Sequence, residues 1–221
     1  MYPPMHPPIR TLIKICGLST PETLEAALEA GADMVGFVFF PPSPRNLNLD
    51  DAMALGAQAQ GRSLKVALSV DATDAFLDAA IEAARPDLLQ LHGKETHERV
   101  LDLKRRFGLP VMKAIHVSGP DDLAAVAAYE HAADRLIFDA RPPKGAILPG
   151  GNGAAFDWTI LKSVQTGLPW MLSGGINPGN VAQALAVTRA PGVDVSSGVE
   201  SSPGVKDAAM IRDFIQRTRA A

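Results

Sequence analysis

The sequence has a single cysteine, Cys16, among its 221 residues. A disulfide within the chain is therefore excluded, and such sparing use of cysteine is typical of a reducing compartment. No apolar run approaches the length of a membrane-spanning helix. Charges of both signs are interspersed and the formal net charge is only −3, so nothing indicates a nucleic-acid or membrane partner. We expect a cytoplasmic protein.

The first residues contain no apolar core of the kind that a signal peptide needs. Residues 1–11 are instead expected to form a short arm, and residues 12–221 a single catalytic domain. With 47% hydrophobic and 20% charged residues, the composition is that of an ordinary globular protein with enough chain for a well-buried core. No linker, low-complexity tract or second domain is evident.

Eight short apolar segments recur along the chain with little polar alternation, which is typical of strands buried on both faces. They cover residues 12–15, 34–40, 65–70, 88–91, 111–116, 136–139, 170–173 and 193–196. Segments with helical spacing lie between them. An apolar segment and the helical segment after it make one β-then-α unit. Eight of these units in 221 residues predict an α/β protein, a single closed (β/α)8 TIM barrel. The alternative is a doubly wound open sheet, which would normally have fewer units and a Gly-rich dinucleotide turn, and that turn is missing.

Boundary signals agree with this alternation. Thr20, followed by a proline, predicts the start of the first helix, and Gly31 predicts its end. Thr96 and Gly108 frame the fourth helix in the same way. A final helix is expected over residues 207–219.

In a barrel of this kind the site lies on the loops that follow the strands, so residues at strand ends become candidates. Cys16 ends the first strand beside a helix start, where a reactive thiol would meet a ligand; the alternative is a small buried apolar residue. Asp139 ends an otherwise apolar strand, either as a structural cap or as the acid of an acid–base pair with Cys16. A basic Cys16 needs a lowered pKa, and Lys14, on the same strand face, is one candidate for the nearby cation that would lower it.

Two glycine-containing turns follow the seventh and eighth strands, where such barrels commonly hold a phosphate. Gly174 and Gly175 expose backbone N–H groups in the first turn, and Ser197 and Gly198 do so in the second. A helix is expected to begin at Asn177-Pro178 and to direct its positive end toward the anion. Tight turns without a ligand are the alternative.

Three further residues are candidates for ligand contacts. Arg45 lies in a proline-rich, stiff loop that suits recognition of a carboxylate, although a plain surface arginine is the alternative. Gln90 and His92 alternate along the fourth strand and so point to one side of it, either into the ligand pocket or into a hydrogen-bonded layer of the barrel interior. The breaker-rich connection over residues 141–153 is long enough to be a binding loop. His116 carries no signal, and no grouping of histidine, cysteine and carboxylates has metal-ligand spacing, so no metal is expected.

In their order and spacing, several of these segments resemble the phosphoribosylanthranilate isomerases, the (β/α)8 barrels of the tryptophan pathway. The resemblance runs from Ile13 to about Arg212. It rests on Lys14-Ile15-Cys16-Gly17, Gly36-Phe37-Val38-Phe39, Pro42-Ser43-Pro44-Arg45, Gln90-Leu91-His92-Gly93, Phe138-Asp139, Gly150-Gly151-Asn152-Gly153 with Phe156-Asp157-Trp158, Ser173-Gly174-Gly175-Ile176 and Asp194-Val195-Ser196-Ser197-Gly198-Val199-Glu200. Asn152 departs from the family, which usually has threonine there, and the connection before Gly150 is longer and richer in proline than is common.

The resemblance implies an Amadori rearrangement of N-(5-phosphoribosyl)anthranilate to 1-(2-carboxyphenylamino)-1-deoxyribulose 5-phosphate, without a cofactor. By position it implies that Asp139 is the general acid at the ribose ring oxygen and Cys16 the general base at the sugar C2. Arg45 would hold the anthranilate carboxylate of this small phosphosugar substrate. The turns at Gly174-Gly175 and Ser197-Gly198 would hold its phosphate. The protein is expected to be a monomer or a homodimer.

Other phosphosugar barrels are the nearest alternatives. A metal-dependent pentose-phosphate epimerase needs histidines and carboxylates at several strand ends, and these are missing. The histidine-pathway aminoaldose isomerase would have aspartate in place of Cys16, and indole-glycerol-phosphate synthase would be longer and carry catalytic lysines. A non-catalytic sensor of a phosphate ligand is the alternative from another class, but a sensor needs neither Cys16 nor Asp139.

Overall fold

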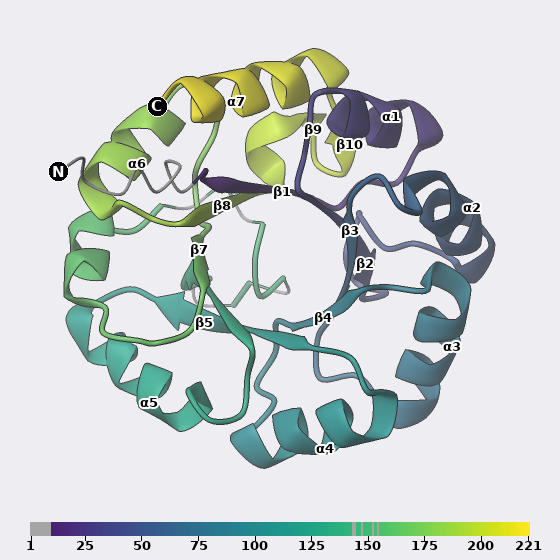
Figure 1. Cartoon of the computed structure of the whole chain (residues 1–221), viewed down its shortest axis with the longest axis horizontal. Helices are drawn as coiled ribbons and strands as arrows, with labels where there is room; N and C mark the ends of the chain where they lie inside the picture. Colours follow the sequence, from purple (N-terminus) through teal and green to yellow (C-terminus); the bar gives the residue numbers. More distant parts are fainter. Residues whose placement is uncertain (1–9, 143–144, 147, 152, 154) are drawn as a thin grey trace, which may run out of the picture.

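A closed barrel of eight parallel strands forms the centre of the molecule (Figure 1). The computed structural model describes residues 10–142, 145–146, 148–151, 153 and 155–221. The strands are β1 (Leu12–Cys16), β2 (Met34–Phe39), β3 (Leu64–Ser69), β4 (Leu88–Leu91), β5 (Val111–Val117), β6 (Arg135–Ala140), β7 (Trp170–Leu172) and β8 (Gly192–Val195). Each pairs with the next along the chain, and β8 closes the barrel against β1. The predicted TIM barrel is confirmed, and every predicted strand end lies within one residue of its observed place.

Helices surround the barrel (Figure 1). They are α1 (Pro21–Glu29), α2 (Leu49–Ala59), α3 (Asp74–Ala84), α4 (His97–Phe107), α5 (Ala125–Tyr129) with the preceding 3-10 helix η1 (Pro120–Ala124), α6 (Val181–Thr188) and α7 (Ala208–Ala220). Thr20 and Thr96 cap α1 and α4 with side-chain oxygens that accept from backbone N–H groups, and Gly108 ends α4 in the left-handed region, as predicted. Within the described part of the chain, no helix combines the length and apolar character needed to cross a membrane.

The sixth unit of the barrel differs from the prediction. After β6 the described residues contain a 3-10 helix, η2 (Trp158–Ser163), in place of an α-helix. The segment contains the branched residues Thr159 and Ile160 and is followed by Val164, and branched residues lower helix propensity. The expectation of eight alternating strands and α-helices is therefore wrong at this unit, although the barrel itself is complete.

The start of α6 is also later than predicted. The helix begins at Val181 rather than at Asn177-Pro178. Asn180 holds the intervening turn, because its Oδ1 accepts from Asn177 N at 2.8 Å and its Nδ2 donates to Gly175 O at 2.9 Å. The turn after β7 is thus fixed by side-chain hydrogen bonds and not by the end of a helix.

The barrel interior consists of stacked layers of side chains, and the layer at the C-terminal ends of the strands lines the pocket. The lower layer is apolar and consists of Leu12, Met34, Val66, Leu88, Met112, Ala114, Ile137 and Met171. Above it lie polar side chains that are wholly buried, among them Lys14 and Gln90. Cys16, Val38 and Leu68 form the next layer, which lines an open pocket at the C-terminal ends of the strands.

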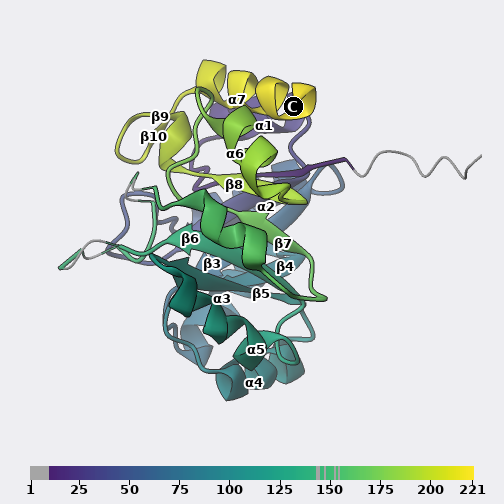
Figure 2. The same ribbon diagram turned by 90° about the vertical axis from the view of Figure 1, so that its left-hand side faces the viewer.

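A short antiparallel hairpin stands beside this open end of the barrel, at the left of the side view (Figure 2). It consists of β9 (Glu200–Ser202) and β10 (Val205–Lys206) and was not predicted. The expected N-terminal arm falls almost wholly outside the described residues, since residues 1–9 are not among them.

Candidate active site

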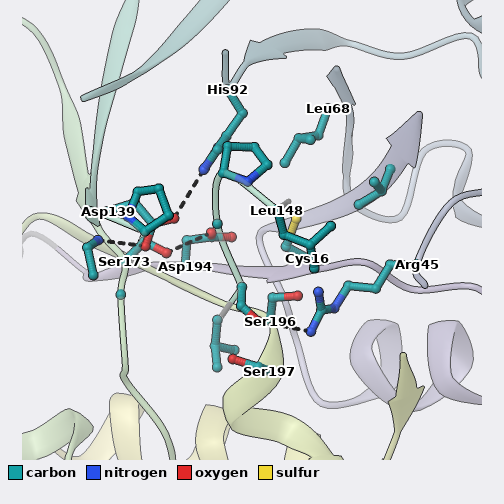
Figure 3. Close-up of a pocket in the computed structure, with 18 of the residues that line it drawn as sticks. Cys16, Arg45, Leu68, His92, Asp139, Leu148, Ser173, Asp194, Ser196 and Ser197 are labelled. Atoms are coloured by element: carbon teal, nitrogen blue, oxygen red, sulfur yellow. Dashed lines mark hydrogen bonds and ion pairs between the residues drawn. The ribbon is translucent and has the colours of Figure 1, made fainter. Parts of the chain in front are cut away.

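One pocket opens at the C-terminal ends of the strands (Figure 3). It is lined by all nine residues that the sequence singles out as candidates: Cys16, Arg45, Gln90, His92, Asp139, Gly174, Gly175, Ser197 and Gly198. These residues come from the ends of six strands and the loops that follow them: β1, β2, β4, β6, β7 and β8. The barrel therefore gathers residues that are far apart in sequence around a single cavity.

Cys16 lies at the end of β1 and is 3% exposed. Beneath it is a buried ion pair in which Lys14 Nζ donates to Asp194 Oδ1 at 2.7 Å. Burial raises the pKa of the Cys16 thiol, and the neighbouring Lys14 opposes this without reversing it. Burial also works against the charge on Lys14, but Asp194 and Cys16 outweigh it and raise the pKa of Lys14 to about 12. Lys14 thus acts on the pKa of the thiol in the expected direction, but burial outweighs it and Asp194 adds to the rise.

Gly36 on β2 provides the space for this thiol. A Cβ at Gly36 would lie 2.9 Å from Cys16 Sγ and 3.1 Å from Lys14 Nζ. Such distances are too short for ordinary van der Waals contact, so any larger residue would displace the sulfur or the ammonium group. The position of Cys16 therefore depends on the glycine beside it.

Asp139 lies at the end of β6, is 4% exposed, and has a partner for each carboxylate oxygen. Oδ1 accepts from Ala140 N at 2.9 Å, and Oδ2 is 3.1 Å from His92 Nε2. The other ring nitrogen of His92, Nδ1, is 3.0 Å from Gln90 Nε2. Gln90, His92 and Asp139 thus form a continuous chain of polar contacts from β4 to β6.

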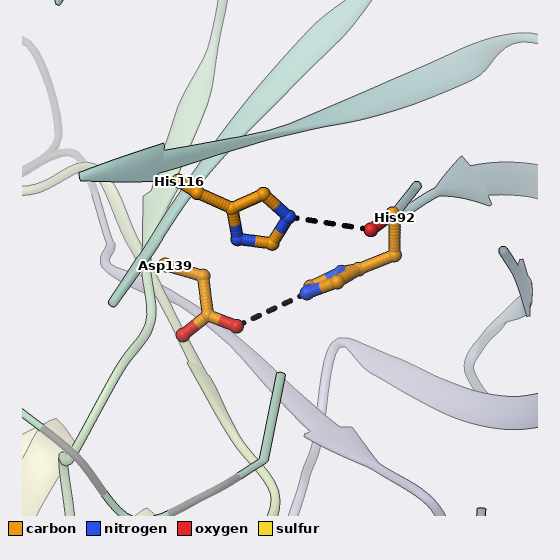
Figure 4. Close-up of side chains that lie close together, drawn as sticks. All are labelled: His92, His116 and Asp139. Atoms are coloured by element: carbon orange, nitrogen blue, oxygen red, sulfur yellow. Dashed lines mark hydrogen bonds and ion pairs between the residues drawn. The ribbon is translucent and has the colours of Figure 1, made fainter. Parts of the chain in front are cut away.

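His116 on β5 lies against this chain of contacts, and sequence reasoning missed it (Figure 4). Its Nε2 is 3.3 Å from the backbone carbonyl oxygen of His92, and the two rings meet edge to face with centroids 5.2 Å apart. Burial lowers the pKa of His116, and His92 adds to this effect. Nδ1 of His116 is buried without a hydrogen-bond partner among the described residues. A neutral imidazole therefore borders the His92–Asp139 pair.

Three of these side chains meet at distances that suit a metal ion. His92, His116 and Asp139 each offer one ligand atom, and the three atoms lie within 4.8 Å of one another. The sequence does not reveal this cluster, because each residue comes from a different strand. Two histidines and a carboxylate suit a transition metal, but His92 Nε2 and Asp139 Oδ2 already share a hydrogen bond. Removal of metal ions from the protein distinguishes a metal site at these atoms from a hydrogen bond between them.

Arg45 is buried, 5% exposed, and is not a plain surface arginine. Its Nε and Nη2 donate to the two carboxylate oxygens of Glu200 at 2.7 and 2.8 Å. Lys206 Nζ donates to the same carboxylate at 2.6 Å. Burial opposes the charge on Glu200, but Arg45 and Lys206 outweigh it and lower its pKa to about 2. The guanidinium is therefore held in one orientation, and its Nη1 has no hydrogen-bond partner among the described residues.

Glu200 and Lys206 are functional candidates that sequence reasoning did not single out. Glu200 lies 155 positions from Arg45 along the chain, so no local pattern joins them. Lys206 also donates to Ser196 O at 2.9 Å and to Ser196 Oγ at 3.1 Å. The hairpin β9–β10 thus ties the loop of Arg45 to the turn after β8.

The connection after β6 packs onto the pocket. Gly151 O accepts from Arg45 Nη2 at 3.2 Å. A Cβ at Gly150 would lie 2.5 Å from His92 Nε2 and 2.6 Å from Asp139 Oδ2. The described part of this connection therefore touches Arg45 and the His92–Asp139 pair, as a binding loop would. Asn152 lies outside the described residues.

The turns after β7 and β8 line another side of the pocket. Gly174 and Gly175 have φ values of 83° and 68°, in the left-handed region that favours glycine. A Cβ at Gly198 would lie 2.0 Å from Ile176 O, so the two turns are in close contact. The N–H groups of these glycines and of Ser197 donate to no backbone carbonyl among the described residues. Unpaired N–H groups at a pocket wall suit an anion.

Both the sequence and the fold of the chain are similar to those of known proteins. A sequence model of a family, described as N-(5'phosphoribosyl)anthranilate (PRA) isomerase, matches residues 13–217. A relative from Rhodopseudomonas palustris (strain ATCC BAA-98 / CGA009), named N-(5'-phosphoribosyl)anthranilate isomerase, is 64% identical over 211 residues, 96% of this chain and 99% of its own. A relative of the same name from Nitrobacter winogradskyi is 64% identical over 210 residues, 95% of this chain and 93% of its own.

Solved structures are similar over nearly the whole chain. Phosphoribosyl anthranilate isomerase from Thermotoga maritima superposes with a TM-score of 0.85 at 32% identity, covering 96% of this chain and 100% of its own. A phosphoribosyl anthranilate isomerase in complex with reduced 1-(o-carboxyphenylamino)-1-deoxyribulose 5-phosphate superposes with a TM-score of 0.80 at 30% identity, with the same coverage of 96% and 100%.

Proposed function

The chain belongs to the N-(5'-phosphoribosyl)anthranilate isomerase family, and we propose that its pocket performs the family's isomerisation with Cys16 as general base and Asp139 as general acid. The activity itself, an isomerisation in tryptophan biosynthesis, follows from membership of the family. The assignment of the two proton transfers to these two residues is our proposal, and it rests on the chemistry of the substrate.

The first proton transfer opens the sugar ring. Asp139 gives a proton to the ribose ring oxygen, and the bond between that oxygen and C1 breaks. The lone pair of the anthranilate nitrogen then forms a C1=N double bond, so the open-chain intermediate is a cationic iminium. A buried carboxyl group at the pocket wall is well placed for this step, because water does not compete for its proton.

The second proton transfer moves the double bond. The Cys16 thiolate takes the proton from C2, and the C2–H electron pair forms a C1=C2 bond that neutralises the iminium. The resulting enolamine gains a proton at C1 and loses the proton of its C2 hydroxyl, which completes the aminoketose. No atom is gained or lost overall, so no redox cofactor or co-reactant is required.

The raised pKa of Cys16 fits the role of a base that acts on a cation. Burial raises the pKa of the thiol in the unliganded pocket, and a thiolate of higher pKa is the stronger base. An iminium cation close to the sulfur favours the thiolate, since an opposite charge stabilises the ionised form. The base is thus fully active only after ring opening has produced the cation.

Two anion-binding features complete the proposal. Arg45, held by Glu200 in a fixed orientation, would receive the anthranilate carboxylate through its remaining donor. The turns at Gly174-Gly175 and Ser197-Gly198 would receive the phosphate. One observation carries the proposal as a whole: a buried thiol, a buried carboxyl group, a buried arginine and two glycine turns line the same pocket. The reduced aminoketose phosphate bound by a related enzyme supports this substrate class.

The proposal is tested by mixing freshly made phosphoribosylanthranilate with the purified protein and following the loss of anthranilate-type fluorescence. Loss well above the spontaneous background is expected, and product formation is confirmed by chromatography. Fluorescence loss at the background rate would contradict the proposed reaction and would direct the search to another aminoaldose substrate.

Gly36→Ala is expected to lower kcat by about 10- to 100-fold with little change in KM, because a displacement of reacting groups by about 1 Å can cost that much. The added methyl group would meet Cys16 Sγ at 2.9 Å and so move the base. Steady-state kinetics measure the effect. Gly119→Ala is the matched control, since nothing lies within 4 Å of a Cβ there. Equal kcat in wild type and Gly36→Ala would contradict the role of Gly36.

Gly198→Ala is expected to raise KM by at least about tenfold, because each lost charge-assisted hydrogen bond to a phosphate weakens binding by about 1.5–3 kcal/mol. The Cβ would collide with Ile176 O at 2.0 Å and push the two turns apart. KM and the inhibition constant of inorganic phosphate report the effect. Unchanged values for both would show that the turns do not hold the phosphate.

Metal removal is expected to leave turnover unchanged. His92 Nε2 and Asp139 Oδ2 share a hydrogen bond, and both proton transfers use side chains of the chain alone. Dialysis against EDTA, with metal analysis before and after, provides the measurement. Activity that disappears with the metal and returns on addition of Zn²⁺ would instead assign His92, His116 and Asp139 to a metal site.

We further propose that the protein works in the cytoplasm, as its single cysteine indicates, and acts as a monomer or a homodimer. A related Thermotoga maritima enzyme is described as dimeric and has also been solved as monomers. Sedimentation equilibrium distinguishes the two states, and a larger assembly would contradict both.

A further inference from the structure

We propose that Lys206 is a specificity-determining residue: by sharing Glu200 with Arg45, it leaves the positive charge of Arg45 available to the carboxylate of the substrate. Arg45 lines the pocket, whereas Glu200 and Lys206 do not (Figure 3). Lys206 therefore acts through Arg45 and not by touching the substrate. The inference rests on the proposed role of Arg45 as the group that receives the anthranilate carboxylate.

The carboxylate of Glu200 has a full set of hydrogen-bond donors. Its Oε1 accepts from Arg45 Nε at 2.7 Å and from Lys206 Nζ at 2.6 Å. Its Oε2 accepts from Arg45 Nη2 at 2.8 Å and from Gly204 N at 3.1 Å. A carboxylate accepts about four hydrogen bonds, so Glu200 is held between the two cations and has no capacity left for a further partner.

The surroundings of Lys206 suit a charged ammonium group. Its Nζ has three oxygen partners, which are Glu200 Oε1 at 2.6 Å, Ser196 O at 2.9 Å and Ser196 Oγ at 3.1 Å. This matches the three N–H donors of an ammonium group. Burial lowers the pKa of Lys206, but the charge of Glu200 opposes this effect. Because the pKa of Glu200 is about 2, its carboxylate is ionised at neutral pH and favours the proton on Lys206.

The cluster of Arg45, Glu200 and Lys206 is buried and carries a net positive charge. The three side chains are 6%, 3% and 1% exposed, in that order. Two cations share one anion, and no other carboxylate among the described residues forms an ion pair with either cation. One positive charge therefore stays unbalanced at the pocket wall, where burial makes it costly until an anion balances it.

Arg45 is the member of this cluster through which the surplus charge can act on a ligand. Its Nη1 has no hydrogen-bond partner among the described residues. A Cβ at Gly151 would lie 2.8 Å from this nitrogen, so the glycine leaves it uncovered. Without Lys206, Glu200 would balance Arg45 alone. A ligand carboxylate would then meet a neutral ion pair, with the negative charge of Glu200 no longer offset by a second cation.

The test compares two ligands that differ only in the carboxylate. One is reduced 1-(o-carboxyphenylamino)-1-deoxyribulose 5-phosphate, and the other is the same compound prepared with aniline in place of anthranilate. Calorimetric titration gives a Kd for each ligand. The carboxylate preference is the Kd of the aniline compound divided by that of the carboxylated compound.

Lys206→Met removes the charge and keeps much of the length of the side chain. We expect the carboxylate preference to fall by at least about tenfold, because one buried charge acts on a nearby ion over several ångströms. A merely structural role, in which Lys206 holds Ser196 and the turn after it, would weaken both ligands alike and leave the preference unchanged. Lys206→Gln, whose amide can still donate to Glu200, replaces Lys206→Met if that variant does not fold.

A double variant separates charge from packing. Lys206→Met with Glu200→Gln removes one cation and one anion, so Arg45 again carries the surplus charge. The carboxylate preference should return to within about threefold of the wild type. Lys113→Met is the matched control, because it removes an equally buried ammonium group that pairs with Glu95 at 3.0 Å and does not line the pocket. Its carboxylate preference should equal that of the wild type.

Three results would overturn the inference. An unchanged preference in a folded Lys206 variant would overturn it and leave the proposed acid and base, which turnover tests, intact. A preference that falls in the single variant and falls further in the double variant would assign Lys206 to the packing of the hairpin. Equal Kd values for the two ligands in the wild type would remove the proposed role of Arg45, and this inference with it.

Discussion

Replacing Cys16 by alanine is expected to lower kcat by about 10²–10⁴-fold, the range that general base catalysis contributes. The loss corresponds to about 3–5 kcal/mol of transition-state stabilisation. Cys16 Sγ is the base that takes the C2 proton, and no other described side chain occupies its place at the end of β1. The affinity for reduced 1-(o-carboxyphenylamino)-1-deoxyribulose 5-phosphate should change by less than about threefold, because the phosphate turns and Arg45 are untouched. Stopped-flow kinetics and calorimetric titration provide the two measurements.

Cys16→Ser is the matched control for packing, since it keeps the shape of the side chain and replaces the thiol by a much weaker acid. It should be as inactive as Cys16→Ala. In the wild type, kcat/KM should rise with pH, because the base must lose its proton to act. The rise should lie above the ordinary range of a thiol, since burial raises the pKa of Cys16 in the free enzyme. A serine variant with near-normal kcat would exclude Cys16 as the base.

Asp139→Asn is the second change with a large expected effect, again a loss of about 10²–10⁴-fold in kcat. Asparagine has the same shape and can still accept a hydrogen bond from Ala140 N, but it has no acidic proton for the ring oxygen. Ring opening should therefore become the slow step. Rapid mixing should show that the substrate persists with its ring closed and that no open-chain iminium builds up.

Ligand affinity and folding serve as the controls for this variant. Asp139→Asn should bind the reduced aminoketose phosphate with wild-type affinity and should unfold within a few degrees of the wild type, since asparagine keeps the volume of the side chain and its hydrogen bond from Ala140 N. His92→Gln offers a comparison that removes the Oδ2 partner at 3.1 Å while leaving the carboxyl group in place. It should retain more activity than Asp139→Asn. The opposite order would mean that His92, and not Asp139, delivers the proton.

The barrel was predictable from sequence for a physical reason. Parallel strands covered on both faces read as unbroken apolar runs, and each run is closed off by capping and breaking residues such as Thr96 and Gly108. The helical layer was less predictable. In the sixth unit, branched residues within η2 reduce helix propensity. At the start of α6, Asn180 fixes a turn through contacts with Asn177 and Gly175 that depend on the folded loop.

The candidate site was predictable where a rule of the fold applies. Barrel sites occur at strand ends, and this rule selects Cys16, His92 and Asp139 without any further information. The same rule also reaches His116, which ends the fifth predicted strand, but nothing in the sequence signals its contact with the backbone of His92, so it was set aside. The rule misses Glu200, because the pairing with Arg45 joins positions 155 residues apart.

The direction of the pKa shift of Cys16 could not be predicted from the sequence, for a different reason. The sequence places Lys14 on the same strand face, and that neighbour alone would lower the pKa of the thiol. The direction is reversed by burial and by Asp194, which pairs with Lys14 from the opposite end of the chain. Proximity along a strand therefore predicts which groups interact, whereas the sign of a pKa shift depends on the whole cavity.

The most direct single measurement is the single-turnover decay of anthranilate-type fluorescence with wild type, Cys16→Ala and Asp139→Asn in excess over freshly made phosphoribosylanthranilate. Each protein is first shown to bind the reduced aminoketose phosphate. We expect rapid decay with the wild type and decay near the spontaneous rate with both variants. Decay at a near-wild-type rate with either variant would show that the residue is not the acid or base of this reaction.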